Sequence, residues 1–129
     1  MAYQESSLGP ILATVKGING KVVGTTDLFT VPALPAGQSV PIYAAIIRLT
    51  TAVGVTGTIK IGIGVVAGED DIFSSTNLTG FNSTGNTYIF STTGVRKLPV
   101  AGDVIKLGID NAFGGTTATL SVDLIGLIN

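Results

Sequence analysis

Three adjacent carboxylates, Glu69, Asp70 and Asp71, form the only acidic cluster in the sequence. Calcium takes about 6–8 oxygen ligands, so such a cluster has the right chemistry for a cation site. However, the spacing lacks the alternating aspartates and the glycine of a calcium loop, and neighbouring side chains on an extended backbone point apart. The pattern favours a solvated loop tip, and no metal site is predicted.

Other common catalytic groups are missing. The chain has neither histidine nor cysteine, which excludes thiolate zinc sites, cysteine nucleophiles and Ser-His-Asp triads. Asp27, Asp103, Asp110 and Asp123 lie near expected strand ends or on polar faces, where carboxylates keep sheet edges soluble. Glycoside hydrolysis needs a carboxyl group of raised pKa opposite a second one, and the sequence marks no such pair. We therefore expect neither an enzyme nor a bound cofactor.

Composition limits the partners. Hydrophobic residues make up 45% of the chain and charged residues only 12%, against roughly 25% charged in ordinary domains. A net charge of −1 leaves no basic excess for binding nucleic acid. The longest apolar run, Tyr43–Ile47, is far shorter than the ~20 residues of a membrane span. A signal peptide is not expected either, because it would begin with basic residues and none precedes Lys16. The apolar surplus predicts contact between subunits, and hence a homo-oligomer.

The elements that carry these residues are strands. Val, Ile and Thr account for 44 of the 129 residues, and alternating apolar positions predict half-buried strands within residues 58–65, 105–110 and 117–124. Val40–Thr51 differs because both of its faces are apolar. It is expected to be a central strand that also meets a partner, which makes Tyr43 and Ile47 candidate interface residues.

Two of these strands share a pattern. Ile59-Lys60-Ile61-Gly62-Ile63 recurs as Ile105-Lys106-Leu107-Gly108-Ile109, with apolar residues on one face and a Lys-Gly pair on the other. Glycine inside a strand costs stability unless another group approaches closely. The pattern indicates either two similar strands of one sheet or a bare sheet face on which another chain lies. The second interpretation makes Gly62, Gly64 and Gly108 candidate interface residues.

Turn residues divide the chain into about eight strands. Asn19-Gly20 predicts a type I′ hairpin turn, because both residues readily adopt positive φ. Two prolines within residues 31–37 exclude a central strand and predict a crossover loop, and residues 98–103 predict a turn that enters a strand. Residues 67–86 predict a long loop, pinned to the core by Phe73 and Phe81.

The strand number and spacing fit one all-β domain. We expect an antiparallel β-sandwich over residues 11–129, in the form of an eight-stranded jelly roll, preceded by a flexible N-terminal arm at residues 1–10. An up-and-down or immunoglobulin-like sandwich stays open, because strand order does not follow from the sequence. The arm is either a frayed terminus or a segment that orders on a neighbouring subunit.

Three segments carry a family resemblance: residues 24–33 (GTTDLFTVPA), residues 41–48 (PIYAAIIR) and residues 119–126 (TLSVDLIG). Together they resemble small β-sandwich structural proteins of tailed bacteriophage virions, especially capsid decoration (cement) proteins and related fibre heads. The resemblance spans most of residues 20–128. It implies a trimeric β-structure that sits on the capsid at a local symmetry axis and reinforces subunit junctions, with Met1–Pro10 gripping the shell.

The sequence therefore predicts a structural virion protein, made in the host cytoplasm and located on the capsid surface, with the major capsid protein as partner. A cement stabilises the shell because it binds the assembled form and not its parts. The alternative is a carbohydrate- or receptor-binding β-sandwich of a phage fibre, although aromatic residues are only 6% and tryptophan is absent. A small barrel enzyme is a third alternative, disfavoured by the lack of histidine metal ligands.

Overall fold

The computed structural model describes residues 5–6, 9–52, 57–63, 72–78, 85–91, 98–114 and 117–127. In these residues the regular elements are all strands. Their bounds are β1 Glu5–Ser6, β2 Gly9–Asn19, β3 Gly24–Thr30, β4 Ile42–Ala52, β5 Thr58–Gly62, β6 Phe73–Asn77, β7 Thr87–Ser91, β8 Val104–Asn111 and β9 Ala118–Gly126.

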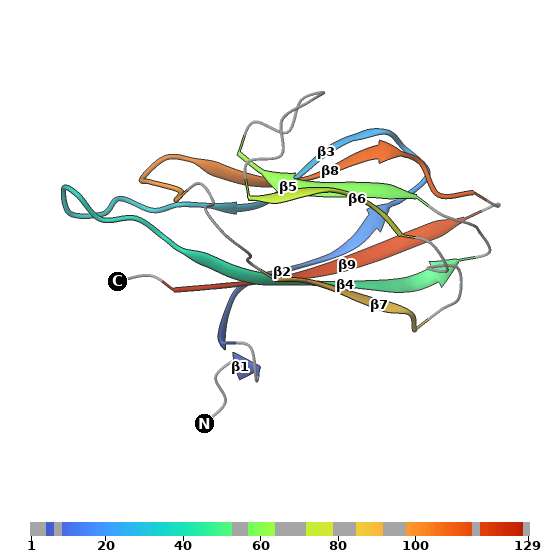
Figure 1. The fold of residues 1–129 in the computed structure, drawn as a ribbon, viewed down its shortest axis with the longest axis horizontal. Helices are drawn as coiled ribbons and strands as arrows, with labels where there is room; N and C mark the ends of the chain where they lie inside the picture. Colours follow the sequence, from blue (N-terminus) through green and yellow to red (C-terminus); the bar gives the residue numbers. More distant parts are fainter. Residues whose placement is uncertain are drawn as a thin grey trace.

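The strands form two antiparallel sheets that pack face to face (Figure 1). One sheet has the order β1-β2-β9-β4-β7, in which the two-residue β1 pairs with the start of β2. The other sheet has the order β3-β8-β5-β6. The antiparallel β-sandwich expected from the strand patterns is thereby confirmed.

The strand order follows from one nested set of antiparallel pairings. β2 pairs with β9, β3 with β8, β4 with β7 and β5 with β6. From β2 onwards, each strand lies in the opposite sheet from the strand before it, except that β5 and β6 are neighbours in one sheet. Most connections therefore cross the ends of the sandwich.

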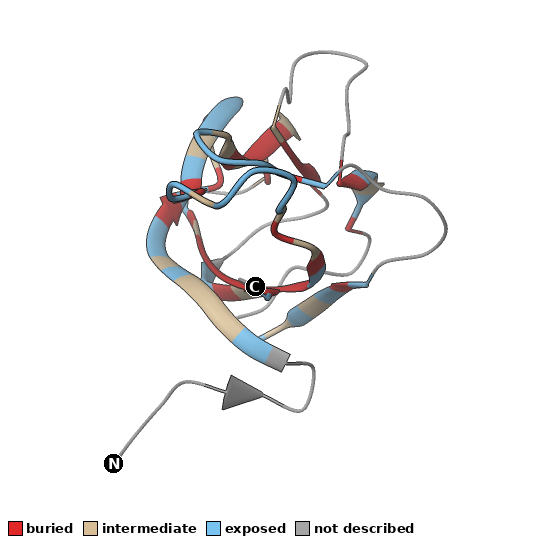
Figure 2. Ribbon diagram, turned by 90° about the vertical axis from the view of Figure 1, so that its left-hand side faces the viewer, coloured by how far each residue is buried: buried red, intermediate tan, exposed pale blue. Residues whose placement is uncertain are grey.

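The core lies between the two sheets and is built from aliphatic side chains and phenylalanines. Figure 2 shows buried residues along strands of both sheets. Fully buried residues at the centre include Ile47, Leu49, Ile59, Leu107 and Leu120. The expectation that β4 is a central strand covered on both faces is confirmed: it lies between β9 and β7, and its outward-facing Ala44 and Ile46 form a second buried cluster with Ile125.

The turn at Asn19-Gly20 was predicted wrongly. β2 and β3 lie in different sheets, and neither residue has positive φ. Close packing explains the glycine instead, since a Cβ on Gly20 would lie 3.0 Å from Phe113 Cδ2 and 3.2 Å from Ala118 Cβ. The Gly20 N–H also donates to the Ala118 carbonyl at 2.7 Å. Gly20 therefore lets the connection from β2 to β3 pack closely against Phe113 and Ala118.

The two predicted connections around the prolines are confirmed. Residues 31–41 carry the chain from β3 to β4 in the other sheet. The Asp103 N–H donates to the Val100 carbonyl at 3.0 Å, closing a turn directly before β8.

The predicted long loop at residues 67–86 is wrong in part, because it contains β6. Phe73 is 1% exposed and does anchor this segment in the core, stacking on Phe90 at a centroid distance of 5.2 Å. The rest of β6 is polar and mostly exposed, as suits an edge strand, so its sequence lacks an apolar alternation. Phe81 lies outside the described residues.

The start of the sandwich also differs slightly from the expected boundary. β2 begins at Gly9, and Glu5 and Ser6 pair with Pro10 and Gly9 as β1. The last two residues assigned to the arm are thus the first two of a sandwich strand.

Candidate interaction surfaces

The residues singled out on β4 lie in opposite environments. Tyr43 is 41% exposed, whereas Ile47 has no exposed surface. A register shift between Ile42 and Ala44 moves the alternation by one residue, so that Ile42 and Ile47 both belong to the inner core. Ile47 therefore stabilises the sandwich and offers no surface to a partner, while Tyr43 does.

The repeated Lys-Gly pattern has a structural explanation. β5 and β8 are neighbours in one sheet, with Lys60 opposite Gly108 and Gly62 opposite Lys106. Each lysine therefore crosses to a position without a side chain, where its methylene stem can lie flat. Gly62 and Gly108 are both buried and Lys60 is 2% exposed, so the sheet face is not bare at these residues. Gly64 lies outside the described residues.

Lys60 and Asp110 form an ion pair that the sequence patterns did not predict. Lys60 Nζ lies 3.0 Å from Asp110 Oδ1, and the side chains are 3% and 33% exposed. The Ser75 hydroxyl donates to Asp110 Oδ2 at 2.6 Å. Partial burial acts to raise the pKa of Asp110, but the hydrogen bonds from Ser75 and Lys60 and the charge of Lys60 outweigh it, so the pKa of Asp110 is lowered from 3.8.

This lowered pKa predicts a loss of stability in acid. The Asp110 carboxylate stabilises the fold fully above its unfolded-state pKa, and this contribution disappears as the pH falls through the lower folded-state pKa. Melting temperatures measured from neutral pH to below 3.8 should therefore fall more steeply for the natural chain than for Asp110→Asn. Parallel curves for the two proteins would contradict this role of Asp110.

A second ion pair lies on the outer face of the other sheet. Arg48 Nη1 on β4 is 2.5 Å from Asp123 Oδ2 on β9. Asp123 is 6% exposed and the neighbouring Ser121 is 5% exposed, although both lie on the outward side of β9. The pair neutralises a buried carboxylate in the middle of the sheet and leaves Arg48 partly exposed.

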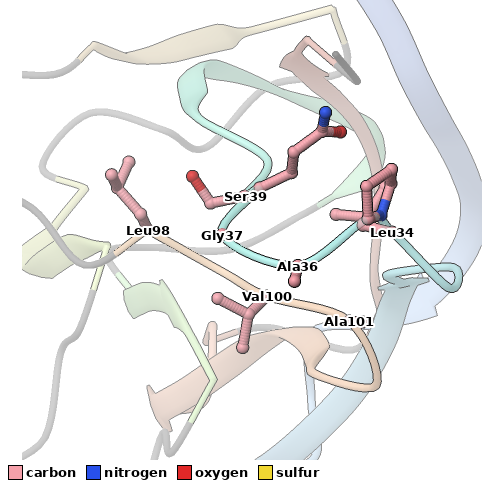
Figure 3. Close-up of a pocket in the computed structure, with 9 residues that line it drawn as sticks. Leu34, Ala36, Gly37, Ser39, Leu98, Val100 and Ala101 are labelled. Atoms are coloured by element: carbon pink, nitrogen blue, oxygen red, sulfur yellow. The ribbon is translucent and has the colours of Figure 1, made fainter.

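Two loops form an apolar groove of about 430 Å³ at one end of the sandwich. Figure 3 shows them side by side, Leu98 and Val100 on one and Leu34 and Ser39 on the other. The nine lining residues include no charged side chain: Leu34, Pro35, Ala36, Gly37, Gln38, Ser39, Leu98, Val100 and Ala101. The groove can therefore remove apolar surface of a partner from water, with few polar groups to direct a small ligand.

Backbone bonds hold these two loops together. The Val40 N–H donates to the Pro99 carbonyl at 2.8 Å, and the Gly102 N–H donates to the Val31 carbonyl at 3.0 Å. Each loop also turns at a glycine of positive φ, Gly37 at 83° and Gly102 at 88°, which other residues rarely adopt. The groove is thus a built feature, with Leu98 54% and Val100 48% exposed at its rim.

Further apolar surface lies at the same end of the molecule. The Leu127 N–H donates to the Pro41 carbonyl at 3.1 Å, which brings Leu127, 37% exposed, beside the start of β4 and Tyr43. Of the interface residues expected from the sequence, Tyr43 lies at this end of the sandwich and is exposed. The groove itself does not follow from the sequence, because its two segments are far apart in the chain and the sequence predicts only a crossover loop for residues 31–37 and a turn for residues 98–103.

Within the described part of the chain, no group of three or more His, Cys, Asp or Glu side chains is arranged to hold a metal ion. The same residues contain no helix long and apolar enough to cross a membrane. The fold and these surfaces define an antiparallel β-sandwich with an apolar loop end. Comparison of the chain with protein-family models, curated proteins and solved structures gave no match.

Proposed function

We propose that the protein is a structural virion protein, specifically a capsid decoration protein that binds the major capsid protein and stabilises the assembled phage head. The observation that carries the proposal is the uncharged apolar groove at the loop end of the sandwich. A groove whose two loops are joined by backbone hydrogen bonds, and whose rim exposes Leu98 and Val100, suits lasting contact with another protein. The low charge of the chain, 12%, is tolerable when much of the surface becomes interface.

The proposal includes a jelly-roll assignment for the sandwich. The nested pairings from β2–β9 inward to β5–β6, distributed alternately between the two sheets, support it. Eight-stranded jelly rolls occur in viral capsid and lectin domains, so the assignment agrees with a virion protein without selecting one function among these.

The remaining parts of the proposal follow from the sequence. The protein acts on the capsid surface as a homo-oligomer, for which the family resemblance favours a trimer, and it has no catalytic role and no cofactor. Binding only the assembled shell shifts the equilibrium towards assembly.

Co-sedimentation with heads tests this function. Purified protein is mixed with expanded, empty heads of the phage that encodes it, and the pellet is assayed for saturable binding. Leu98→Asp combined with Val100→Asp should weaken binding by about ten-fold or more, because it places charge in the apolar groove. The matched control is Val22→Asp with Val23→Asp; these valines are 58% and 61% exposed. They belong to the connection between β2 and β3, which lies at the end of the sandwich opposite the groove loops (Figure 1).

Two results decide the proposal. Saturable pelleting of the natural chain and of the control variant, with loss for the groove variant, supports it. A natural chain that stays in the supernatant overturns it.

A carbohydrate-binding function is the second candidate. It is favoured by a row of hydrogen-bonded polar side chains across β6, β5 and β8 of the sheet β3-β8-β5-β6. Thr58 Oγ1 donates to Asn77 Oδ1 at 3.3 Å and accepts from Asn111 Nδ2 at 3.1 Å. Ser75 and Asp110 lie beside this row. Such amide, hydroxyl and carboxylate groups match the donors and acceptors of sugar hydroxyls. Binding on a glycan array without pelleting on heads would select this function.

A further inference from the structure

β7 is a sheet edge without the usual protection. It ends the order β2-β9-β4-β7, and none of the described strands pairs with its outer side. Its sequence, TYIFS, contains no charge, proline or glycine. Its ladder with β4 runs without a register shift, from Ala44 opposite Ser91 to Arg48 opposite Thr87.

The other long edges carry devices that discourage pairing. β3 has Asp27 and a register shift directly after it. β6 is irregular where it pairs with β5 between Ile59 and Ile61. β2 has Pro10, Lys16 and two register shifts, and β1 covers its start. Natural proteins use charges, prolines and bulges to block edge-to-edge association, so the absence of all three from β7 is informative.

The ladder also fixes which backbone groups of β7 point outward. The Leu49 N–H donates to the Asn86 carbonyl at 2.9 Å. In an antiparallel ladder alternate residues bond to the neighbouring strand, so Tyr88 and Phe90 bond towards β4. The N–H and C=O groups of Thr87, Ile89 and Ser91 therefore face away from the sheet, ready to pair with another strand.

We infer that β7 pairs antiparallel with β7 of a second copy of this chain, about a two-fold axis at Ile89. This register places Ile89 opposite Ile89 of the second copy as a hydrogen-bonded pair and Thr87 opposite Ser91 of the second copy. The strand is thus complementary to itself in size and polarity. The pairing joins the two sheets into one continuous sheet, as in strand addition.

The side chains and charges beside β7 favour a second copy of this chain as the partner. Ile89 is 49% exposed and lies beside Ile46 on the outer face, so the two-fold axis brings two half-exposed isoleucines together. The nearest charge on β4, Arg48, is neutralised by Asp123. As far as the described residues beside β7 are concerned, two copies can therefore approach edge to edge without repulsion between like charges. The pair requires no capsid, and it is a dimer where the family resemblance favours a trimer.

Two substitutions at Ile89 test the pairing. Ile89→Lys adds the charge that natural edges use, and Ile89→Pro removes an outward N–H that the ladder with β4 does not use. Each should raise the dimer dissociation constant by about ten-fold or more, with an unchanged strand signal in circular dichroism. Val23→Lys, at a 61% exposed valine far from β7, is the matched control.

Light scattering after size exclusion measures the mass of the assembly, and amide hydrogen exchange identifies the strand that forms the interface. The natural chain and Val23→Lys should show twice the chain mass of 13.0 kDa, and both Ile89 variants the single mass. The amides of Thr87, Ile89 and Ser91 should exchange slowly in the concentrated natural chain and quickly on dilution. The inference is overturned if the natural chain has the mass of a monomer or a trimer, or if these amides exchange fast at high concentration. Both results hold even if an Ile89 variant fails to fold.

Discussion

Replacing Phe113 with alanine is expected to lower the free energy of unfolding by about 3–5 kcal/mol. Phe113 is 1% exposed and closes the end of the core after β8. A Cβ on Gly57 would lie 2.7 Å from its ring atoms, and a Cβ on Gly20 3.0 Å from Cδ2. Two glycines thus form walls of the ring site, and glycine has no side chain that could move into a cavity.

The alanine variant removes the ring and keeps the backbone hydrogen bonds of this residue. The Phe113 N–H donates to the Gly20 carbonyl at 2.9 Å, and the Phe113 carbonyl accepts from Lys21 Nζ at 2.6 Å; alanine retains both groups. Urea unfolding followed by circular dichroism measures the loss. Val23→Ala, at a 61% exposed position, should change stability by less than about 0.5 kcal/mol. A loss below about 1 kcal/mol for Phe113→Ala would show that the end of the core collapses around the smaller residue.

The sandwich itself was predictable because its signal is local. Alternation along β5, β8 and β9 and the turn residues between strands depend only on neighbours in the sequence. Ile47 shows where local reasoning stops, because the register shift between Ile42 and Ala44 turns it into the core. Gly20 shows the same limit, since its reason is the ring of Phe113, far away in the sequence.

The interaction surfaces were less predictable than the fold, and for the same reason. The Lys-Gly repeat is visible in the sequence, but the pairing of Lys60 with Gly108 exists only once β5 and β8 are adjacent. The groove needs Leu34 and Leu98 on two loops joined by backbone bonds. The exposed edge of β7 depends on which strand ends the sheet, a property of strand order that no single strand encodes.

The buried pair on β5 and β8 leads to two substitutions with different expected outcomes. Asp110→Asn should lower the free energy of unfolding by about 1–3 kcal/mol, because it removes the carboxylate that neutralises a buried ammonium. Lys60→Met is expected to be neutral or stabilising, since methionine removes the charge that must be desolvated and keeps much of the volume. The exposures decide this asymmetry: the Lys60 side chain is 3% exposed and that of Asp110 33%.

Two effects can be separated by urea unfolding at neutral pH: the loss of the carboxylate partner and the cost of burying the ammonium. The measurement uses both single variants and the double variant. If burial of the ammonium is the main cost, the double variant should be more stable than Asp110→Asn alone, because the buried ammonium is gone. If Lys60→Met is instead the more destabilising substitution, then the remaining contacts of Lys60 across Gly108 outweigh its desolvation. In that case the lysine stem holds β5 to β8, and the glycine opposite it exists to admit that stem.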